Sequence, residues 1–278
     1  MSEQVLFLSI YGFLLLGTLV YLLPKAILTF RREVARGKGG AEPPQSVDQS
    51  TDFINFIDIF VLLFVFLLYY SSGKGEVEVS EKSLLIALGA QSFVIIMTIA
   101  VIAFRVNVIQ LFGLTQMRWK HLGWSAIIIT SAWLVTYLLQ LGGYFSFLES
   151  YYGKPPLQEA VQALQNSENT TLLWLIGIVA CIGAPLSEEV LFRGYVFPIV
   201  KRFTAFWPAA LLSGLFFAVI HYNLASLPTL FVMGVLLAVA YEYTRSLWVP
   251  IIAHCVFNSA TVLSQVIMRA QGLTPDLS

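Results

Sequence analysis

Long apolar runs separated by short polar loops constrain the fold of this chain more than any other feature. A helix needs about 20 apolar residues to cross about 30 Å of hydrocarbon. Hydrophobic residues make up 58% of the 278 positions and charged residues 12%, which is outside the range of soluble domains. The pattern predicts an all-α polytopic membrane protein with about eight transmembrane helices, near residues 5–29, 53–70, 83–104, 123–147, 171–200, 206–223, 227–243 and 247–267.

Basic residues set the expected orientation. The first run has no positive charge before it and is followed by Arg31 and Arg32, so we interpret it as a retained span rather than a cleaved signal peptide. Because positively charged loops stay in the cytoplasm, the N-terminus should lie outside and the loops with Arg118, Lys201 and Arg245 inside. We therefore expect a multi-pass protein of the plasma (cell inner) membrane.

The chain divides into two parts by its pattern of polar residues. Residues 1–115 should form three N-terminal spans with a cytoplasmic loop at 31–52, which is rich in Gly and Pro. Residues 116–278 should form a helical core that carries the polar motifs described below. Before the fifth span, Leu157, Val161 and Leu164 recur at helical spacing, which predicts a short amphipathic helix on the outer surface over 155–168.

Charge and cysteine content exclude some classes of function. The formal net charge is zero and the charges form no basic face, so nucleic acid is not an expected partner. Cys181 and Cys255 both lie inside apolar runs, where a buried thiol and a disulfide are both compatible with the sequence.

Three charged residues lie inside the fifth apolar run. An ionised side chain at the centre of a span costs roughly 2.5–3.5 kcal/mol, so Glu188, Glu189 and Arg193 need compensating partners. Glu189 and Arg193 are four residues apart and share a helix face, whereas Glu188 projects about 100° away. We predict that Glu189 pairs with Arg193 and that Glu188 is left without an ionic partner. Pro185 has no backbone N–H to donate to the carbonyl of Cys181, which predicts a helix kink one turn before the Glu189–Arg193 pair.

Two histidines and an asparagine on later spans match the depth of Glu188. Counted from the turn near Thr204, His221 lies about as far along the sixth span as Glu188 lies along the fifth. His254 and Asn258 are four apart on one face of the last span, somewhat nearer the cytoplasm, and helix tilt would have to supply the difference. The sequence therefore predicts a polar cluster inside the membrane.

Such a cluster suits the attack of water on a carbonyl group. Low dielectric raises the pKa of a carboxyl group, and a neighbouring imidazole can share the proton of a water molecule. An imidazole and a carboxamide can donate hydrogen bonds to an oxyanion. Glu188, His221 and His254 could instead hold a zinc ion with an open position for water. The His-Glu-x-x-His motif of zinc proteases is absent from the chain, and residue types alone leave both mechanisms open.

The late spans resemble those of a known family. Three motifs in chain order carry the resemblance to the CPBP family, the CAAX type II prenyl endopeptidases and bacteriocin-processing relatives also called Abi intramembrane proteases: Glu188-Glu189-x-x-x-Arg193, Phe217-x-x-x-His221 and His254-x-x-x-Asn258. The likeness covers roughly residues 120–266. It implies an eight-helix, glutamate-dependent endopeptidase whose polar cavity opens toward the cytoplasm, and residues 116–278 would be its catalytic core.

The resemblance also implies a role for each motif residue. Glu188 would be the catalytic glutamate, with His221 as its partner in activating water. The implied oxyanion donors are His254 and Asn258, and the implied supporting residues are Glu189 and Arg193. We expect no required cofactor, with a zinc ion on Glu188, His221 and His254 as the alternative. Phe192 and Phe217 would wall the cavity or pack in the core.

Two other classes of function remain compatible with the sequence. Intramembrane Glu and His residues also build proton relays, so a proton-coupled transporter or channel is one alternative, with Asp58 as an early counterpart. A non-catalytic immunity or structural membrane protein is the other. For the protease, the expected partners are the lipid bilayer and a peptide or protein substrate, lipidated or C-terminal substrates included.

Overall fold

The fold is built from helices alone in the part of the chain that is described. A computed structural model describes residues 3–39, 54, 57–72, 78–153 and 159–272, and no strand occurs among them. The elements are α1 (Glu3–Gly39), α2 (Ile57–Ser72), α3 (Glu81–Ala103), α4 (Val108–Leu111), η2 (Trp119–Leu122), α5 (Gly123–Leu141), α6 (Tyr144–Tyr152), α7 (Glu159–Asn166), α8 (Thr170–Ile178), η3 (Val179–Gly183), α9 (Ala184–Leu191), η4 (Phe192–Val196), α10 (Phe197–Phe203), α11 (Phe206–Val219), α12 (Leu227–Thr244) and α13 (Trp248–Ala270).

The predicted fold class is confirmed, but the number of full-length spans differs from eight. Helices lie in all eight predicted segments, and six helical stretches among the described residues are long and apolar enough to cross a membrane: Val5–Thr29, Glu81–Ala103, Trp119–Leu141, Thr170–Phe203, Leu227–Thr244 and Trp248–Ala270. The other two, Ile57–Leu67 and Phe206–Val219, are shorter apolar helices. Helix α11 has 14 residues and is therefore about 21 Å long, because each residue adds 1.5 Å.

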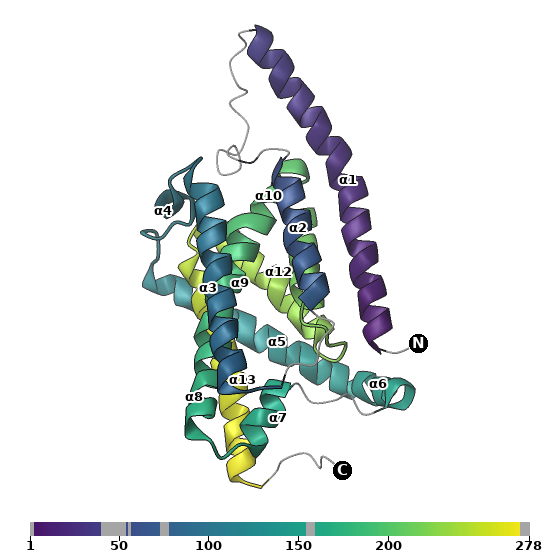
Figure 1. Ribbon diagram of the computed structural model, residues 1–278, viewed down its shortest axis with the longest axis vertical. Coiled ribbons are helices and arrows are strands. Elements are labelled where there is room, and N and C mark those ends of the chain that lie inside the picture. The colour runs from purple at the N-terminus through teal and green to yellow at the C-terminus, as the bar shows by residue number, and fades with distance from the viewer. Residues whose placement is uncertain (1–2, 40–53, 55–56, 73–77, 154–158, 273–278) are drawn as a thin grey trace.

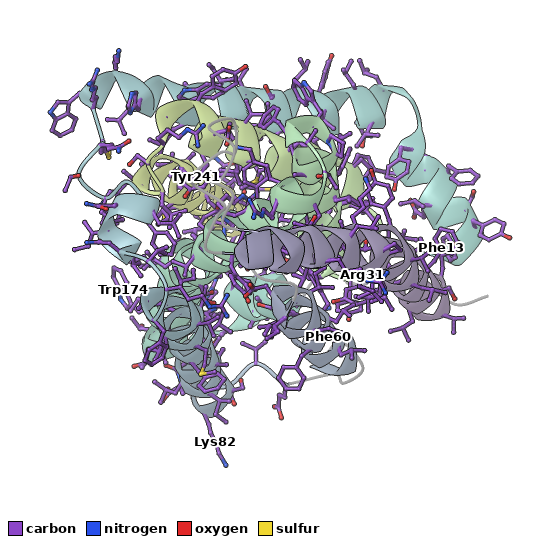
Figure 2. All side chains as sticks on the ribbon, turned by 90° about the horizontal axis from the view of Figure 1, so that it is seen from above. Phe13, Arg31, Phe60, Lys82, Trp174 and Tyr241 are labelled. Atoms are coloured by element: carbon purple, nitrogen blue, oxygen red, sulfur yellow. The ribbon has the colours of Figure 1, made fainter. Side chains whose placement is uncertain are left out.

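Most of the long helices lie along one axis of the molecule. In Figure 1, α2, α3 and α13 run roughly parallel to the long axis, while α5 crosses them obliquely and continues into α6. Helix α5 packs against α12 and α13. The outer surface carries large apolar side chains such as those of Phe13, Phe60 and Trp174, which are exposed (Figure 2). Exposed apolar surface of this extent is typical of contact with lipid.

The fifth span is a composite of α-helical and π-helical segments. It runs from α8 through η3, α9 and η4 to α10, and both η3 and η4 are π-helical turns. A π-helical turn hydrogen-bonds to the fifth residue along instead of the fourth, and such turns are frequent at functional sites. Glu188 and Glu189 lie on α9, between the two π-helical turns.

A buried ion pair joins the N-terminal helices to this span. Arg105 donates to both carboxylate oxygens of Asp58, at 2.8 and 2.7 Å, and the hydroxyl of Tyr195 donates to Asp58 at 2.6 Å. Asp58 on α2 is fully buried. A buried carboxylate is stable only when it is paired and hydrogen-bonded, so these contacts fix α2 against η4.

Two surface predictions are modified by the structure. Helix α1 continues to Gly39, so residues 31–39 of the predicted loop 31–52 are helical, while residues 40–52 lie outside the described residues. The predicted amphipathic helix is α7, and its apolar residues Val161 and Leu164 line the cavity described below, while Leu157 lies outside the described residues. Cys181 and Cys255 are free thiols. The division of the chain at residues 115 and 116 stays a prediction.

Two glycines allow α11 and α12 to approach closely. A Cβ atom added to Gly234 would lie 2.8 Å from the Cα of Gly214 and 3.1 Å from its carbonyl oxygen. Backbone atoms cannot move aside as a flexible side chain can. Small residues that bring two backbones together are a common device in membrane helix packing.

We predict that Gly234→Ala destabilises the protein by about 1–3 kcal/mol, the usual cost of overpacking. Thermal unfolding in detergent would measure the loss. Gly89→Ala on α3 is the matched control, because no atom lies within 4 Å of its added Cβ and alanine favours the helix over glycine. Equal stability of the two variants would contradict the close packing of α11 against α12.

Candidate active site

The predicted pair of Glu189 and Arg193 is present and completely buried. Arg193 Nη1 lies 2.8 Å from Glu189 Oε1, and Arg193 Nη2 donates to the backbone carbonyl of Gly234 at 2.9 Å. Glu189 Oε1 also lies 2.8 Å from His254 Nδ1. This last contact was not predicted, because it joins residues 65 positions apart on different helices. The pair therefore also holds the ring of His254.

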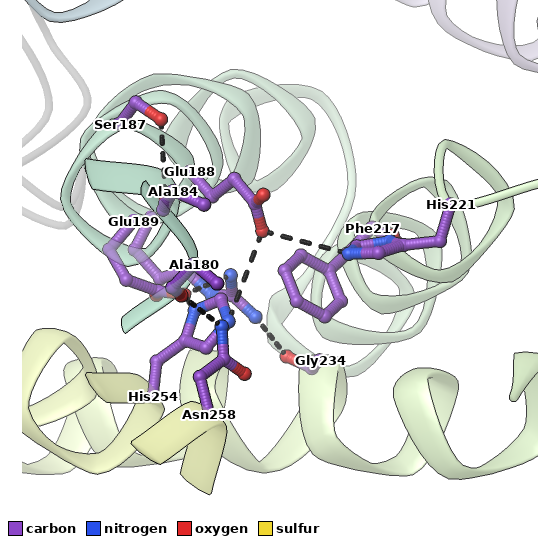
Figure 3. Close-up of polar contacts among 11 residues, drawn as sticks. Ala180, Ala184, Ser187, Glu188, Glu189, Phe217, His221, Gly234, His254 and Asn258 are labelled. Atoms are coloured by element: carbon purple, nitrogen blue, oxygen red, sulfur yellow. Dashed lines mark hydrogen bonds and ion pairs between the residues drawn. The ribbon is translucent and has the colours of Figure 1, made fainter. Parts of the chain in front are cut away.

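Glu188 lies between the two membrane histidines, as Figure 3 shows. Its Oε2 atom is 3.9 Å from His221 Nε2 and 4.0 Å from His254 Nε2. Among the described residues, Oε2 is buried and has no hydrogen-bond partner. We predicted that these three residues lie at similar depths in the membrane, and the structure confirms that they are close together. Separations near 4 Å are too long for direct hydrogen bonds but allow one water molecule to bond to both groups.

Hydrogen bonds at the Nδ1 atoms orient both imidazole rings. His221 Nδ1 lies 2.7 Å from the carbonyl oxygen of Phe217, which can only accept, so Nδ1 carries the proton. His254 Nδ1 faces the carboxylate of Glu189 in the same way. In the neutral form of each ring, Nε2 is then an acceptor directed at Glu188. Three groups able to take a proton from water therefore face one point.

Asn258 bonds to the backbone of the fifth span. Its Nδ2 atom donates to the carbonyl of Ala180 at 2.8 Å. In the π-helical register of η3, the nitrogen that would face this carbonyl belongs to Pro185, which has no hydrogen to donate. The kink predicted at Pro185 thus takes the form of a π-helical turn, and the carbonyl served by Asn258 is that of Ala180 instead of Cys181. The second hydrogen of Nδ2 remains for another acceptor.

Phe217 packs at the centre of the cluster. Its ring centroid is 5.1 Å from that of His221 and 5.5 Å from that of His254, and the Arg193 guanidinium lies 4.8 Å from the ring. Phe192 meets it edge-on at 5.5 Å. Both phenylalanines are fully buried and neither lines the cavity described below, so core packing was the correct alternative.

The loop that carries His221 is anchored to the N-terminal helices. Tyr222 has a positive φ of 49°, which is rare for a residue other than glycine. Its ring stacks on Tyr11 of α1 at 6.2 Å, and its hydroxyl donates to the carbonyl of Tyr69 on α2 at 2.9 Å. Sequence reasoning missed Tyr222, because neither the positive φ nor its distant partners leave a local pattern.

A cavity of about 590 Å³ adjoins the cluster. His221, His254 and Asn258 line one part of it, and Val161 and Leu164 of α7 line another. A volume in this range suits a small ligand or a short peptide segment. The catalytic candidates are therefore next to a space that a substrate can enter.

The side chains of Glu188, His221 and His254 are spaced more widely than the ligands of a tetrahedral zinc ion. A tetrahedral zinc ion holds its oxygen and nitrogen ligands about 3.3 Å apart, whereas Glu188 lies 3.9 and 4.0 Å from the two histidines. Within the described part of the chain, no three His, Cys, Asp or Glu side chains are grouped so that they could hold a metal ion.

Comparisons with known proteins find relatives over part of the chain. The chain is 34% identical to "Putative membrane peptidase YdiL" of Bacillus subtilis (strain 168), over 37% of this chain and 45% of that protein. It is 38% identical to "Membrane-embedded CAAX protease MroQ" of Staphylococcus aureus (strain USA300), over 37% of this chain and 47% of that protein. The chain spans slightly less than half the length of these curated relatives. No solved structure is significantly similar to it.

The family comparison covers the part of the chain that holds the motifs. Residues 170–260 match the family model described as "Type II CAAX prenyl endopeptidase Rce1-like". All six candidate residues, from Glu188 to Asn258, fall within that range. The resemblance predicted from the three motifs is therefore confirmed over this segment: residues 170–260 are similar to the Rce1-like type II CAAX prenyl endopeptidases.

Proposed function

We propose that this protein is an intramembrane endopeptidase that hydrolyses a peptide bond with water activated by Glu188 and His221. The observation that carries the proposal is the position of Glu188 Oε2, about 4 Å from two imidazole nitrogens beside a cavity. The Rce1-like match and the names of the two relatives support a membrane protease. A peptide or protein in contact with the bilayer would be its substrate.

The contacts suggest how each group acts. Glu188 takes one proton from a water molecule, and the resulting hydroxide bonds to the carbonyl carbon of the substrate. His254, when its ring carries a second proton, donates from Nε2 to the oxyanion, and Asn258 donates its remaining amide hydrogen. The proton held by Glu188 then passes to the departing amine as the carbon–nitrogen bond breaks. Glu189 and Arg193 hold His254 in place and do not touch the substrate.

The alternative functions have less support. A proton-coupled transporter or channel would need a second relay residue, and Asp58, the early candidate, is held by Arg105 and Tyr195. A non-catalytic immunity or structural protein would not require Glu188 to lie about 4 Å from two imidazole nitrogens beside a cavity, whereas water activation does.

We predict that Glu188→Gln lowers cleavage by at least about 10²-fold, the lower end of the contribution of a general base. Peptide termini would be compared by mass spectrometry in cells that express the wild type or the variant. The melting temperature in detergent should stay near that of the wild type, because glutamine fills the same space.

Glu168→Gln on the exposed loop before α8 is the matched control and should cleave normally. Termini that persist in Glu188→Gln but are missing from cells that lack the protein would contradict the mechanism. Termini that are the same with the wild type, with a stable Glu188→Gln protein and in cells that lack the protein would mean that the protein is not a protease of these substrates.

The next prediction concerns the metal. Because the spacing of Glu188, His221 and His254 is too wide for tetrahedral zinc, dialysis against a strong chelator should leave cleavage unchanged. Elemental analysis before and after dialysis would check that any metal has been removed. Activity that disappears on dialysis and returns with added zinc would show that the ion is required.

Two expectations, that the basic loops are cytoplasmic and that the cavity opens toward the cytoplasm, are not compatible with each other in this fold. The cavity is lined by the ends of α8, α12 and α13 that lie far from the turns with Lys201 and Arg245. If the basic loops are cytoplasmic, the cavity opens on the opposite side, and the cytoplasmic opening implied by the resemblance does not hold.

The distribution of basic residues favours one of the two orientations. In the sequence, the segments expected on the side away from Arg118, Lys201 and Arg245 have only four basic residues, Lys74, Lys82, Lys154 and Arg269, which is fewer than the segments expected on the other side have. Because the excess of Lys and Arg marks the cytoplasmic side, we propose that the N-terminus and the cavity face the non-cytoplasmic side.

Single cysteines test this orientation, in a background where Cys181 and Cys255 are replaced by serine. We predict that Glu168→Cys reacts with a membrane-impermeant maleimide in intact cells, whereas Lys120→Cys reacts only after the membrane is permeabilised. The reverse pattern would place the cavity on the cytoplasmic side. Both positions are exposed in the structure, so a difference in labelling reports the side of the membrane.

A further inference from the structure

His221 follows the last regular turn of its helix. Helix α11 ends at Val219. The backbone N–H of His221 donates to the carbonyl of Ala218 at 3.3 Å, and that of Tyr222 donates to Val219 at 3.2 Å. These bonds reach back three residues and have poorer geometry than those of an α-helix. The helix alone therefore holds the backbone of His221 less firmly than it holds the residues before it.

The hydrogen bond of its ring does not fix His221 against the other half of the site. His221 Nδ1 lies 2.7 Å from the carbonyl oxygen of Phe217, one turn earlier in the same segment. This contact sets the rotation of the ring relative to α11. Glu188 Oε2, which lies 3.9 Å from Nε2, belongs to α9 of another span. The distance between the two groups must therefore be set by contacts between helices.

Tyr222 supplies such contacts from the next position in the chain. Its ring stacks on that of Tyr11 of α1, with the centroids 6.2 Å apart and the planes 16° from parallel. The ring of Phe7, also on α1, lies 6.2 Å away. The hydroxyl of Tyr222 donates to the carbonyl of Tyr69 of α2 at 2.9 Å. Two helices that pack against each other (Figure 1) thus hold the residue that follows His221.

The helices that hold Tyr222 are themselves joined to each other and to α11. The hydroxyl of Tyr11 donates to the carbonyl of Phe66 of α2 at 2.7 Å. The ring of Phe66 stacks on that of Phe216 of α11, with the centroids 4.1 Å apart. All three side chains are fully buried. The partners of Tyr222 on α1 and α2 therefore belong to the packed core of the protein.

The backbone of Tyr222 has a conformation that tyrosine disfavours. Its φ of 49° lies in the left-handed region, which costs free energy for a residue with a Cβ atom and is readily adopted by glycine. Glycine would be the better residue if the turn needed only this backbone shape. The strained backbone is therefore stabilised by the contacts of the side chain with α1 and α2.

We propose that Tyr222 is a positioning residue, which uses Tyr11 and the carbonyl of Tyr69 to hold His221 Nε2 toward Glu188. The inference rests on the proposed function, because it assigns a further residue to that same reaction. It also goes beyond it, because α1 and α2, which lie outside the segment matched by the family model, become part of what places the histidine.

Substitutions at position 222 separate the side chain from the backbone. Tyr222→Gly suits the positive φ but loses both contacts, so Glu188-dependent cleavage in cells should fall by about 10²-fold, the effect of displacing a reacting group by about 1 Å. Tyr222→Phe keeps the stacked ring and loses only the hydroxyl bond. It should recover most of the activity and stay within about 2- to 10-fold below the wild type, the range of one hydrogen bond.

Tyr241→Phe is the matched control. The hydroxyl of Tyr241 on α12 donates to the carbonyl of Leu111 on α4 at 3.0 Å. This variant therefore also loses one bond from a tyrosine hydroxyl to a distant backbone carbonyl, but the bond does not involve the loop after α11. Tyr241→Phe should cleave like the wild type.

The ring signals of the histidines report their surroundings without a substrate. The chain has three histidines, so isotope-labelled histidine gives one set of nitrogen signals each for His121, His221 and His254 in the purified full chain, assigned by variants that lack one histidine. The hydrogen bonds of a ring nitrogen set its protonation and hence its signal. In Tyr222→Phe, the Nε2 signal of His221 should shift, while the signals of His121 and His254 should stay as they are in Tyr241→Phe.

The outcomes separate the inference from the proposed function. Normal cleavage by Tyr222→Gly would overturn the inference, because the backbone shape alone would then be enough. An unchanged His221 signal in Tyr222→Phe, or an equal shift of the His254 signal, would also overturn it. If Tyr222→Gly does not fold, the comparison of Tyr222→Phe with Tyr241→Phe decides. The absence of any Glu188-dependent terminus would instead overturn the protease itself.

Discussion

The three-way contact of Glu189 with Arg193 and His254 is the interaction on which the rest of the site depends. One carboxylate oxygen receives both partners at 2.8 Å, in a region from which solvent is excluded. Charges in such a place persist only when each has a partner. The contact joins the fifth crossing to α13, and the bond from Arg193 to the carbonyl of Gly234 adds α12. Three crossings are thereby fixed around Glu188, which is left available for chemistry.

Close packing supports this arrangement. The bond from Arg193 reaches Gly234 at the place where the backbones of α11 and α12 meet, and α11 ends just before His221. The contact between Gly214 and Gly234 therefore sets the distance between α11, which ends just before His221, and α12, which carries the carbonyl bonded to Arg193. Gly234 thus takes part both in a hydrogen bond of the site and in the close approach of the two backbones.

The sequence predicts those parts of the site that follow from helical geometry. The spacing of Glu189 and Arg193 and the equal depth of Glu188 and His221 needed only the rise and period of a helix. The contact of Glu189 with His254 could not be predicted in this way, because it depends on how two helices far apart in the sequence pack against each other. The predicted sixth span, 206–223, is shorter in the structure, because α11 ends at Val219 and residues 220–223 belong to the loop that follows.

The exact form of the irregular helical turns also could not be predicted from the sequence. Pro185 indicated an irregularity, but whether the helix kinks or widens into a π-helical turn depends on a donor such as Asn258 being in reach of the freed carbonyl. The side on which the cavity opens follows from which helix ends diverge, and this is a property of the assembled bundle.

The stacking of Tyr222 on Tyr11 has a consequence for how such domains are compared. The matched segment, residues 170–260, contains every candidate catalytic residue, yet the loop after His221 is held by α1 and α2, which lie outside that segment. A protein that shares the motifs but begins with unrelated helices would have to secure this loop by other means. In this chain, α1 and α2 therefore determine how firmly the loop after His221 is held, although both lie outside the matched segment.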